Sequence, residues 1–264
     1  MFLLGSPEYT EAAGVGIIGA ACAASMPITN LFKAQPSDVA RFSSLTGMYF
    51  EVDLGSAKEV EAVALLYTNA TAPATFRLRG ATSQAGLTSS PPYDSGTLSP
   101  FTGIVTADYP RGLHWLHVLT AAQTLRWWRV DIVDAANPAG FFQAGNFFPF
   151  AAISPANGYD YGYKLGYIDD AATRTSEGGQ RYKRQRIRRR FVEFSMNLLT
   201  EAEAYDDVDR FMRLRGVSSP AIVALDTDAR VQNRMVYGTL EENLVLSFPD
   251  YDDQEASLRV EEMP

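Results

Sequence analysis

The side chains most able to act as acids, bases or metal ligands are few in this sequence. It holds two histidines, His114 and His117, and one cysteine, Cys22. Histidines three residues apart share a face of a helix, but Trp115 and Leu116 between them favour a strand, where that offset points them to opposite faces. One cysteine can form neither a disulfide within the chain nor a thiolate metal cluster. The sequence therefore predicts no metal site and no cofactor.

Motifs of common catalytic sites are also missing. The sequence contains no G-x-S-x-G, no glycine-rich phosphate loop with Lys-Ser/Thr, no H-E-x-x-H and no calcium loop. A glycosidase could work with carboxylates alone, and 31 Asp and Glu are available. The acidic residues gather, however, on the expected exposed side of a helix and in a loop: Asp206, Asp207, Asp209, Asp250, Asp252, Asp253 and Glu255. We therefore predict that the chain is not an enzyme.

A dense run of basic residues is the most prominent feature of the sequence. Seven lie within ten positions: Arg181, Lys183, Arg184, Arg186, Arg188, Arg189 and Arg190. The run could contact nucleic acid, protect the start of a strand from edge pairing, or meet acidic residues of a neighbouring subunit. The last 24 residues hold eight Asp or Glu, among them Asp250, Asp252 and Asp253. Copies arranged head to tail would bring the two patches together, so we favour a subunit interface.

The overall charge limits the partners that the chain could bind. Its 264 residues carry a net charge of −8, whereas a protein that coats nucleic acid needs Lys and Arg to neutralise phosphates. We therefore expect no nucleic-acid recognition.

The N-terminal region contains an apolar stretch, residues 14–24, that is similar to the apolar segment of a signal peptide. The first basic residue is Lys33, and Glu8 and Glu11 stand where a signal peptide has positive charge. The stretch is also too short and too rich in glycine to span a bilayer. We expect a buried strand or a packed arm of a protein made in the cytoplasm.

Aromatic side chains at turns form a second set that could bind a ligand. Rings stack on the apolar faces of sugars, and Tyr93 and Tyr109 lie in turn regions where a sandwich presents such rings. The competing interpretation is that most rings belong to the core, which the run Phe147-Phe148-Pro149-Phe150 favours. Tyr93 and Tyr109 are the residues that we predict to contact a glycan.

In the first part of the chain, the elements predicted to position these side chains are strands. In residues 48–55, Phe50, Val52 and Leu54 alternate with polar neighbours, as in a half-buried strand. The predicted strands are 48–55, 60–67, 75–81, 112–118, 125–133 and 140–153. Many short strands joined by Gly and Pro turns predict an antiparallel jelly-roll β-sandwich that, with its N-terminal arm, covers residues 1–155.

A second unit is predicted after a linker or extended arm at residues 156–180. A long strand at 188–199 precedes Thr200 and Glu203, whose spacing is that of a capping box, and Gly216 ends the helix. Further strands are predicted at 220–225, 235–240, 243–248 and 256–261. Residues 181–264 therefore read as an α+β unit, a small sheet or split barrel with one helix, and the whole chain as mainly β.

The order and spacing of several segments resemble the discoidin-like, galactose-binding-type family in the form found in phage tail proteins. These segments are Met26–Leu31, Gln35–Ser37, Phe50–Gly55, Val60–Leu66, Ala74–Arg79, Tyr93–Gly96, Trp128–Ile132 and Gly140–Gly145. The resemblance implies a jelly-roll sandwich that binds glycans or other surfaces through loops at one end, in some members with a structural calcium. No ligand-binding residue of the family maps onto a position of this sequence.

Residues 181–264 are similar to the C-terminal part of phage minor tail and distal tail proteins. The similarity rests on the long strand, the single helix, Pro220–Asp226, Tyr237-Gly238 and Val260–Glu262. It implies a structural subunit of a phage tail tip or baseplate in the virion, forming a ring or collar with copies of itself. Its other partners would be the tail tube, hub and fibre proteins, with the sandwich facing outward to host surface glycans. The alternatives are a receptor- or carbohydrate-binding module as the main role, or an accessory part of a carbohydrate-active enzyme.

Overall fold

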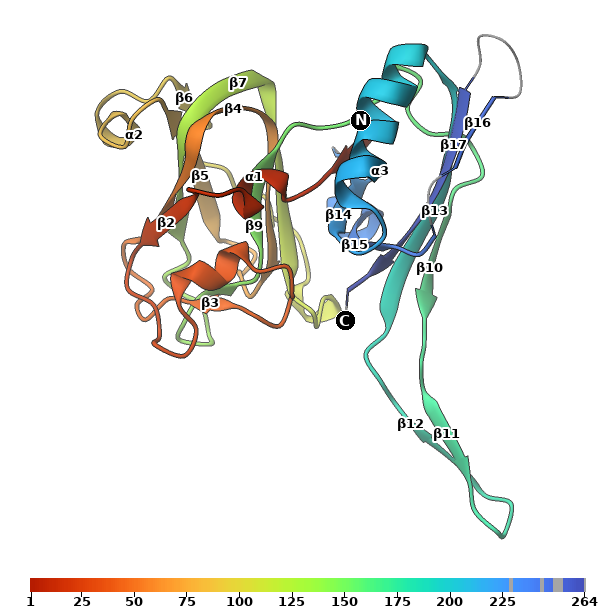
Figure 1. Cartoon of the computed structure of the whole chain (residues 1–264). Coiled ribbons are helices and arrows are strands. Elements are labelled where there is room, and N and C mark those ends of the chain that lie inside the picture. Colours follow the sequence, from red (N-terminus) through yellow and green to blue (C-terminus); the bar gives the residue numbers. More distant parts are fainter. Residues whose placement is uncertain (228–229, 243–244, 249–253, 264) are drawn as a thin grey trace. The chain divides into compact units, whose positions relative to one another are not determined.

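The computed structural model describes residues 1–227, 230–242, 245–248 and 254–263. The chain forms two compact units, one of Ser6–Ala152 and one of Met1–Gly5 together with Ile153–Pro264 (Figure 1). We call them the sandwich unit and the C-terminal unit. The sequence placed residues 1–155 in one unit. The first five residues belong instead to the C-terminal unit, because strand β1 (Leu3–Gly5) pairs with β14 (Pro220–Ala224).

The sandwich unit is built from antiparallel strands. Its larger sheet has six strands in the order β2-β4-β7-β5-β6 with β9 paired to β4, and β3 pairs with β8. The strands are β2 (Gly16–Gly19), β3 (Ala40–Arg41), β4 (Met48–Thr68), β5 (Thr75–Ala81), β6 (Tyr93–Asp94), β7 (Leu113–Val133), β8 (Gln143–Ala144) and β9 (Phe147–Phe150). Short helical segments lie between them: α1 (Glu8–Glu11), η1 (Ile28–Phe32), α2 (Gly86–Ser89) and η2 (Thr106–Asp108).

Strands β4 and β7 contribute to both layers of the sandwich. Each spans 21 residues, and their pairing shifts register between Asp53 and Lys58, where Gly55 has a φ of +73°. The first part of β4 pairs with β2 and the last part with β9. The sheet therefore folds over itself at this bend, visible as the arches of β4 and β7 in Figure 1. The four predicted strands 48–55, 60–67, 112–118 and 125–133 are thus halves of two bent strands.

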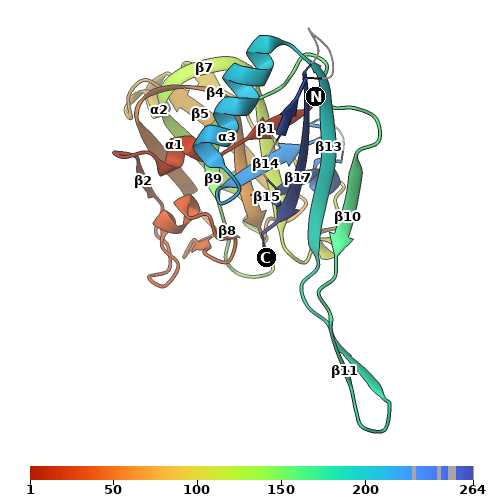
Figure 2. The same ribbon diagram turned by 45° about the vertical axis from the view of Figure 1, so that its right-hand side comes forward.

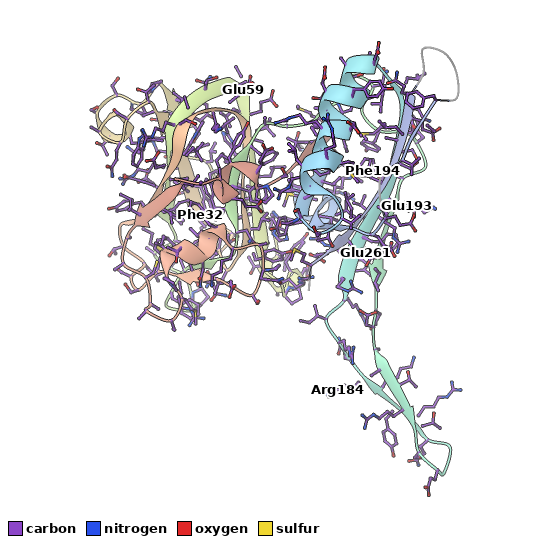
Figure 3. The ribbon with its side chains drawn as sticks, in the orientation of Figure 1. Phe32, Glu59, Arg184, Glu193, Phe194 and Glu261 are labelled. Carbon is purple, nitrogen blue, oxygen red and sulfur yellow. The ribbon has the colours of Figure 1, made fainter. Side chains whose placement is uncertain are left out.

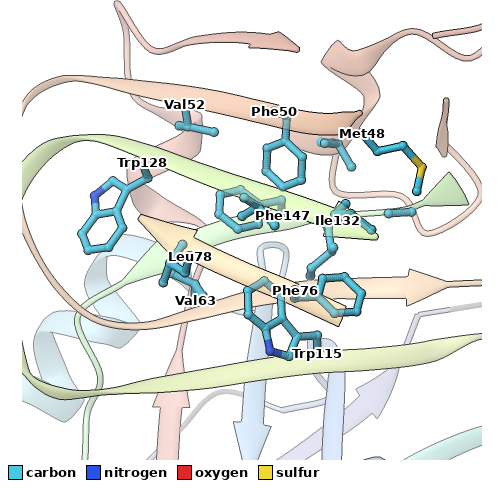
Figure 4. Packing of buried hydrophobic residues seen from close by; sticks show 14 of the residues in the cluster. Met48, Phe50, Val52, Val63, Phe76, Leu78, Trp115, Trp128, Ile132 and Phe147 are labelled. Carbon is cyan, nitrogen blue, oxygen red and sulfur yellow. The ribbon is translucent and has the colours of Figure 1, made fainter. Parts of the chain in front are cut away.

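Aromatic side chains fill the space between the two layers. Phe50 meets the ring of Phe147 with centroids 4.8 Å apart, and Phe76 stacks on Trp115 at 4.9 Å (Figure 4). Each of these four residues is only 1% exposed. Because each pair joins opposite layers, the predicted β-sandwich and its alternating buried positions are confirmed.

The apolar N-terminal stretch forms part of this unit. Strand β2 pairs with β4 at the edge of the sheet, and Ile17 packs against the core. Ile18 on the other face is 50% exposed. The stretch is therefore a half-exposed edge strand rather than the buried strand that its hydrophobicity predicted.

The C-terminal unit has a seven-stranded sheet covered by one main helix. The strand order is β1-β14-β15-β17-β13-β10, with β16 paired to β17. The strands after β1 are β10 (Lys164–Ile168), β13 (Arg189–Leu199), β14, β15 (Met235–Leu240), β16 (Val245–Ser247) and β17 (Gln254–Glu262). A short helix, α4 (Val231–Arg234), precedes β15. This agrees with the predicted small sheet, including the long strand β13, which lies next to the edge strand β10.

The main helix begins with a π-helical segment, η3 (Glu203–Asp209), and continues as α3 (Arg210–Arg215). The amide of Thr200 donates to the carboxylate of Glu203 at 2.8 Å, and the amide of Glu203 donates to the hydroxyl of Thr200 at 3.3 Å. The predicted capping box is therefore confirmed, and Gly216 with a φ of +55° ends the helix as expected. Val208 and Phe211 pack with Phe194 of β13 in the core of this unit.

The segment predicted to be a linker contains strands. β10 pairs with β13 at the edge of the sheet, and β11 (Ala172–Thr175) pairs with β12 (Arg181–Arg184) in a separate two-stranded ribbon. Figure 2 shows this ribbon extending past the end of the sheet of its unit. Most of these residues are exposed, so they lack the hydrophobic alternation by which a half-buried strand is recognised.

Candidate functional site

A cleft of about 330 Å³ opens at one end of the sandwich unit. Three loops form it: the one that follows β4, the one that precedes β7, and the one that follows β7. The lining residues are Tyr67–Thr71, Thr106, Tyr109–Leu113, Asn137–Ala139 and Gln143. Loops at the end of a sandwich are a common place for a binding site, since the two layers hold them rigidly.

Aromatic residues and an arginine form one wall of the cleft. The guanidinium of Arg111 lies 5.5 Å from the centre of the Tyr67 ring, a distance at which a cation and an aromatic ring attract each other. Tyr67 has a φ of +54°, and its amide donates to Nδ1 of His114 at 3.2 Å. That bond requires an unprotonated Nδ1. His114 is therefore a structural residue that holds Tyr67 in an uncommon backbone conformation.

A glycine allows this wall to lie close to β4. Gly112 has a φ of +95°, and a Cβ there would lie 2.7 Å from the backbone oxygen of Thr68. No other residue fits this position without a shift of the backbone. The conformation of the loop before β7 therefore depends on Gly112.

A hydrogen-bonded network behind the cleft joins the loops. Asp134, 3% exposed, accepts bonds from the amide of Thr71 at 3.1 Å, from the hydroxyl of Thr71, and from the amide group of Asn137 at 2.8 Å. Asn137 also donates to the backbone oxygen of Asn69 at 3.0 Å, and the amide of Gln143 donates to the side-chain oxygen of Asn69 at 2.8 Å. The polar groups are thus fixed in place before any ligand arrives.

The chemistry of the cleft favours binding over catalysis. Arg111 is the one charged residue among those that line it. Hydrolysis of a glycoside by two carboxylates needs a pair of them beside the bond to be cleaved, and the lining residues supply none. The cleft offers tyrosine rings, amides and a guanidinium, which are groups that position a polar ligand.

Of the two residues predicted to contact a glycan, the structure brings Tyr109 to the cleft and leaves Tyr93 elsewhere. Tyr93 lies on β6, with its hydroxyl 2.7 Å from Nε2 of His117 and its ring 5.9 Å from that of Trp128. Burial raises the pKa of Tyr93 and lowers the pKa of His117, so both are neutral at pH 7. Nδ1 of His114 and Nε2 of His117 are thus hydrogen-bonded to two different tyrosines. Tyr67 and Arg111 were missed, because Tyr67 ends an apolar strand and Arg111 lies in a loop, and neither pattern marks a residue of a cleft.

The structure separates the basic residues of the predicted subunit interface into two groups. Arg188, Arg189 and Arg190 form ion pairs within the C-terminal unit, with Asp169 at 3.2 Å, Asp170 at 2.9 Å and Glu262 at 3.1 Å respectively. Three other cations stand on the ribbon, namely Arg181, Lys183 and Arg184, and Arg186 follows it. The acidic residues proposed to face them, Asp250, Asp252 and Asp253, lie outside the described residues.

No group of three or more His, Cys, Asp or Glu residues in the described part of the chain is arranged to hold a metal ion. No helix among the described residues is both long and apolar enough to cross a bilayer.

Comparisons with known proteins concern about half of the chain. No family model matches, and no curated protein matches. Solved structures that resemble it include a mutant of chitosan-binding module 1 from a chitosanase/glucanase of Paenibacillus sp. IK-5, at 15% identity over 52% of this chain and 95% of that one, with a TM-score of 0.41. Another is the CBM32 of AlyQ in complex with 4,5-unsaturated mannuronic acid, at 22% identity over 52% and 93%, with a TM-score of 0.38. A third is the family 32 CBM from C. perfringens NanJ in complex with galactose, at 9% identity over 56% and 99%, with a TM-score of 0.40.

One of these neighbours is a chitosan-binding module and the other two are family 32 CBMs. Their identities are low and their TM-scores lie below 0.5, so they decide nothing about the ligand of this chain. The similarity to phage tail proteins stays a prediction.

Proposed function

We propose that the sandwich unit is a carbohydrate-binding module and that the cleft at its end is the binding site. The observation that carries the proposal is the cleft itself, whose lining includes Tyr67, Tyr109, Arg111 and Asn137. Its volume of about 330 Å³ is in the range of small-ligand sites. The half-buried ring of Tyr109 provides apolar surface on which a sugar ring stacks, and the half-buried guanidinium of Arg111 provides donors for its hydroxyls.

The proposal is tested by titrating the whole chain with galactose, chito-oligosaccharides and oligouronates in a calorimeter. Binding of one of them to the native chain, and its loss in Tyr109→Ala, would support the cleft as the site. Tyr161→Ala is the matched control, because Tyr161 is fully exposed in the other unit. Equal binding by Tyr109→Ala and the native chain would locate the site elsewhere. If a broad glycan array also gives no binding, the module does not bind carbohydrate.

A second function, a structural subunit of a phage tail tip, has a different observation in its favour. The C-terminal unit carries a ribbon, β11 and β12, that extends past its own sheet and bears exposed cations. Together with the sequence similarity of residues 181–264, this supports a non-enzymatic subunit that assembles with copies of itself and with other tail proteins. Imaging of phage particles with an antibody against this chain would test that role, and its absence from the tail would exclude it.

A further inference from the structure

The ribbon of the C-terminal unit is separated from the sheet that supports it. β10 and β13 pair as far as Ile168 and Arg189, and the chain continues into β11 and β12, which pair only with each other within the described residues. Figures 1 and 2 agree that this arm, residues 171–187, leaves the sheet at the end where β13 begins. The eight or so residues from the sheet to the tip give it a reach of about 25 Å.

The arm is a concentration of positive charge on an acidic chain. Its basic residues are Arg174, Arg181, Lys183, Arg184 and Arg186, and its one acidic residue is Glu177. The arm thus carries +4, and because the whole chain carries −8, the remaining residues carry −12. None of the five cations forms an ion pair or a side-chain hydrogen bond with a residue that the structure describes, and all five are exposed. Figure 3 shows Arg184 on the arm, apart from the sheet that carries Glu193 and Glu261.

Both faces of the arm are cationic. In its register Arg174 lies opposite Tyr182 and Thr173 opposite Lys183. Because faces alternate along a strand, Arg174 and Arg184 share one face while Arg181 and Lys183 share the other. Like charges on one face repel, and an isolated two-stranded ribbon is only marginally stable in water. An anionic partner would therefore stabilise the arm.

Carboxylates without a cation partner lie at the opposite end of the same unit. β13 leads from the arm to Leu199, eleven residues or about 35 Å further on, where the main helix begins. Glu201 and Asp206 are exposed there, and Glu255 at the start of β17 is half-buried. None of the three pairs with a cation among the described residues. We call this surface the acidic end.

Exposed aromatic rings accompany the carboxylates of the acidic end. Tyr205, 44% exposed, stacks on Phe248, 53% exposed, with their centroids 6.3 Å apart. Guanidinium groups bind aromatic faces as well as carboxylates. The acidic end thus offers both kinds of group that suit the arginines of the arm, whereas the arm points away from the acidic end of its own unit.

We propose that the arm of one copy of this chain docks on the acidic end of a second copy, in a head-to-tail contact. A contact between two different surfaces of identical chains leaves one arm and one acidic end open, so it propagates into a ring or a filament. Duplex DNA is the competing polyanion for a basic ribbon. The charge of −12 on the remaining residues opposes an approach of DNA but favours a second copy. This inference deepens the assembly function proposed above and is independent of carbohydrate binding.

The first test is sedimentation velocity of the full chain over a wide range of concentration, at low and at high salt. Native protein should self-associate, and less at high salt, because the contact is between charges. Arg181→Gln, Lys183→Gln and Arg184→Gln combined should weaken association about tenfold or more, as expected for three exposed ion pairs. The matched control removes two arginines and one lysine from the sandwich unit: Lys33→Gln, Arg77→Gln and Arg126→Gln. A monomer at every concentration, or an equal effect of the control, would overturn the proposal.

A charge exchange identifies the two surfaces. A variant with the three arm cations changed to Glu and a variant with Glu201→Lys, Asp206→Lys and Glu255→Lys should each fail to associate. Mixed together they should associate again, because the intact acidic end of the first meets the intact arm of the second. Circular dichroism and thermal unfolding of each variant check that it is folded, which matters most for Glu255→Lys because Glu255 is half-buried. Failure of the folded mixture to associate would refute the assigned surfaces.

Two further results would distinguish the proposed arm contact from nucleic-acid binding and from the wider assembly function. The native chain could bind a duplex DNA oligonucleotide in a salt-dependent way without associating with itself, and the arm variant could lose that binding. This result would show that the arm binds nucleic acid and not a second copy. If the chain assembles equally well with a neutral arm, the assembly function stands and the arm contact is wrong. If it does not assemble at all, both fail.

Discussion

Replacing Asp134 with alanine should loosen the cleft of the sandwich unit. The carboxylate accepts three hydrogen bonds, two from Thr71 and one from Asn137. Asn137 keeps a second acceptor at Asn69, and the hydroxyl of Thr71 can rotate, so the main loss is the acceptor for the amide of Thr71. Bonds to a charged, buried acceptor are worth about 1.5–3 kcal/mol. We expect the free energy of unfolding of this unit to fall by about 2–3 kcal/mol.

Hydrogen exchange is the suitable assay, because two units need not unfold in one transition. The amide of Thr71 should exchange at least tenfold faster in Asp134→Ala than in the native chain, while amides of the core strand β7 change less. Asp38→Ala is the control, since its side chain is 42% exposed and pairs with Lys33, whose side chain is 53% exposed. Unchanged exchange at Thr71, or an equal effect of the control, would show that Asp134 does not hold the loops together.

Three other substitutions test parts of the structure. Glu262→Ala should destabilise the C-terminal unit by about 3 kcal/mol in urea unfolding, because it removes the carboxylate that lies 3.1 Å from the guanidinium of the largely buried Arg190. An effect below about 1 kcal/mol would contradict this expectation. Gly112→Ala should lower the melting temperature of the sandwich unit and weaken ligand binding, because the added Cβ meets backbone; unchanged melting would contradict the geometry. The bond from Arg77 lowers the pKa of Asp94 from 3.8 to about 2, so this pair stabilises the fold above pH 3.8 and the gain disappears as the pH falls to about 2. Asp94→Asn should remove that part of the acid sensitivity in pH-dependent melting, and identical pH profiles would refute it.

Elements whose residues alternate or cap in the sequence could be predicted. Phe50, Val52 and Leu54 are buried as their alternation indicated, because one face of that strand packs on the core. Thr200 and Glu203 form the capping box, since all of its bonds lie within four residues. Local patterns of this kind depend little on the rest of the chain.

Elements that depend on distant partners could not be predicted. Met1–Gly5 give no pattern of their own, and their place in the C-terminal unit is decided by pairing with β14, more than 200 residues away. β10 is an edge strand with most residues exposed, so its sequence looks like a linker until β13 is beside it. The continuity of β4 through its bend was hidden by Gly55, which reads as the end of a strand.

The residues of the cleft could not be predicted from the sequence for the same reason. Tyr67 lies at the end of β4, whereas Arg111 and Asn137 lie in the loops before and after β7, and only the pairing of β4 with β7 brings them together. A position outside regular structure has no period from which its direction could be read. What the sequence does contain is a trace of the constraint: Gly112 directly follows the arginine of the cleft, where only glycine tolerates the contact with β4. A glycine that directly follows the run Tyr109-Pro110-Arg111 is therefore a better indicator of this site than the two predicted tyrosines, of which one lines the cleft and the other is bound to His117.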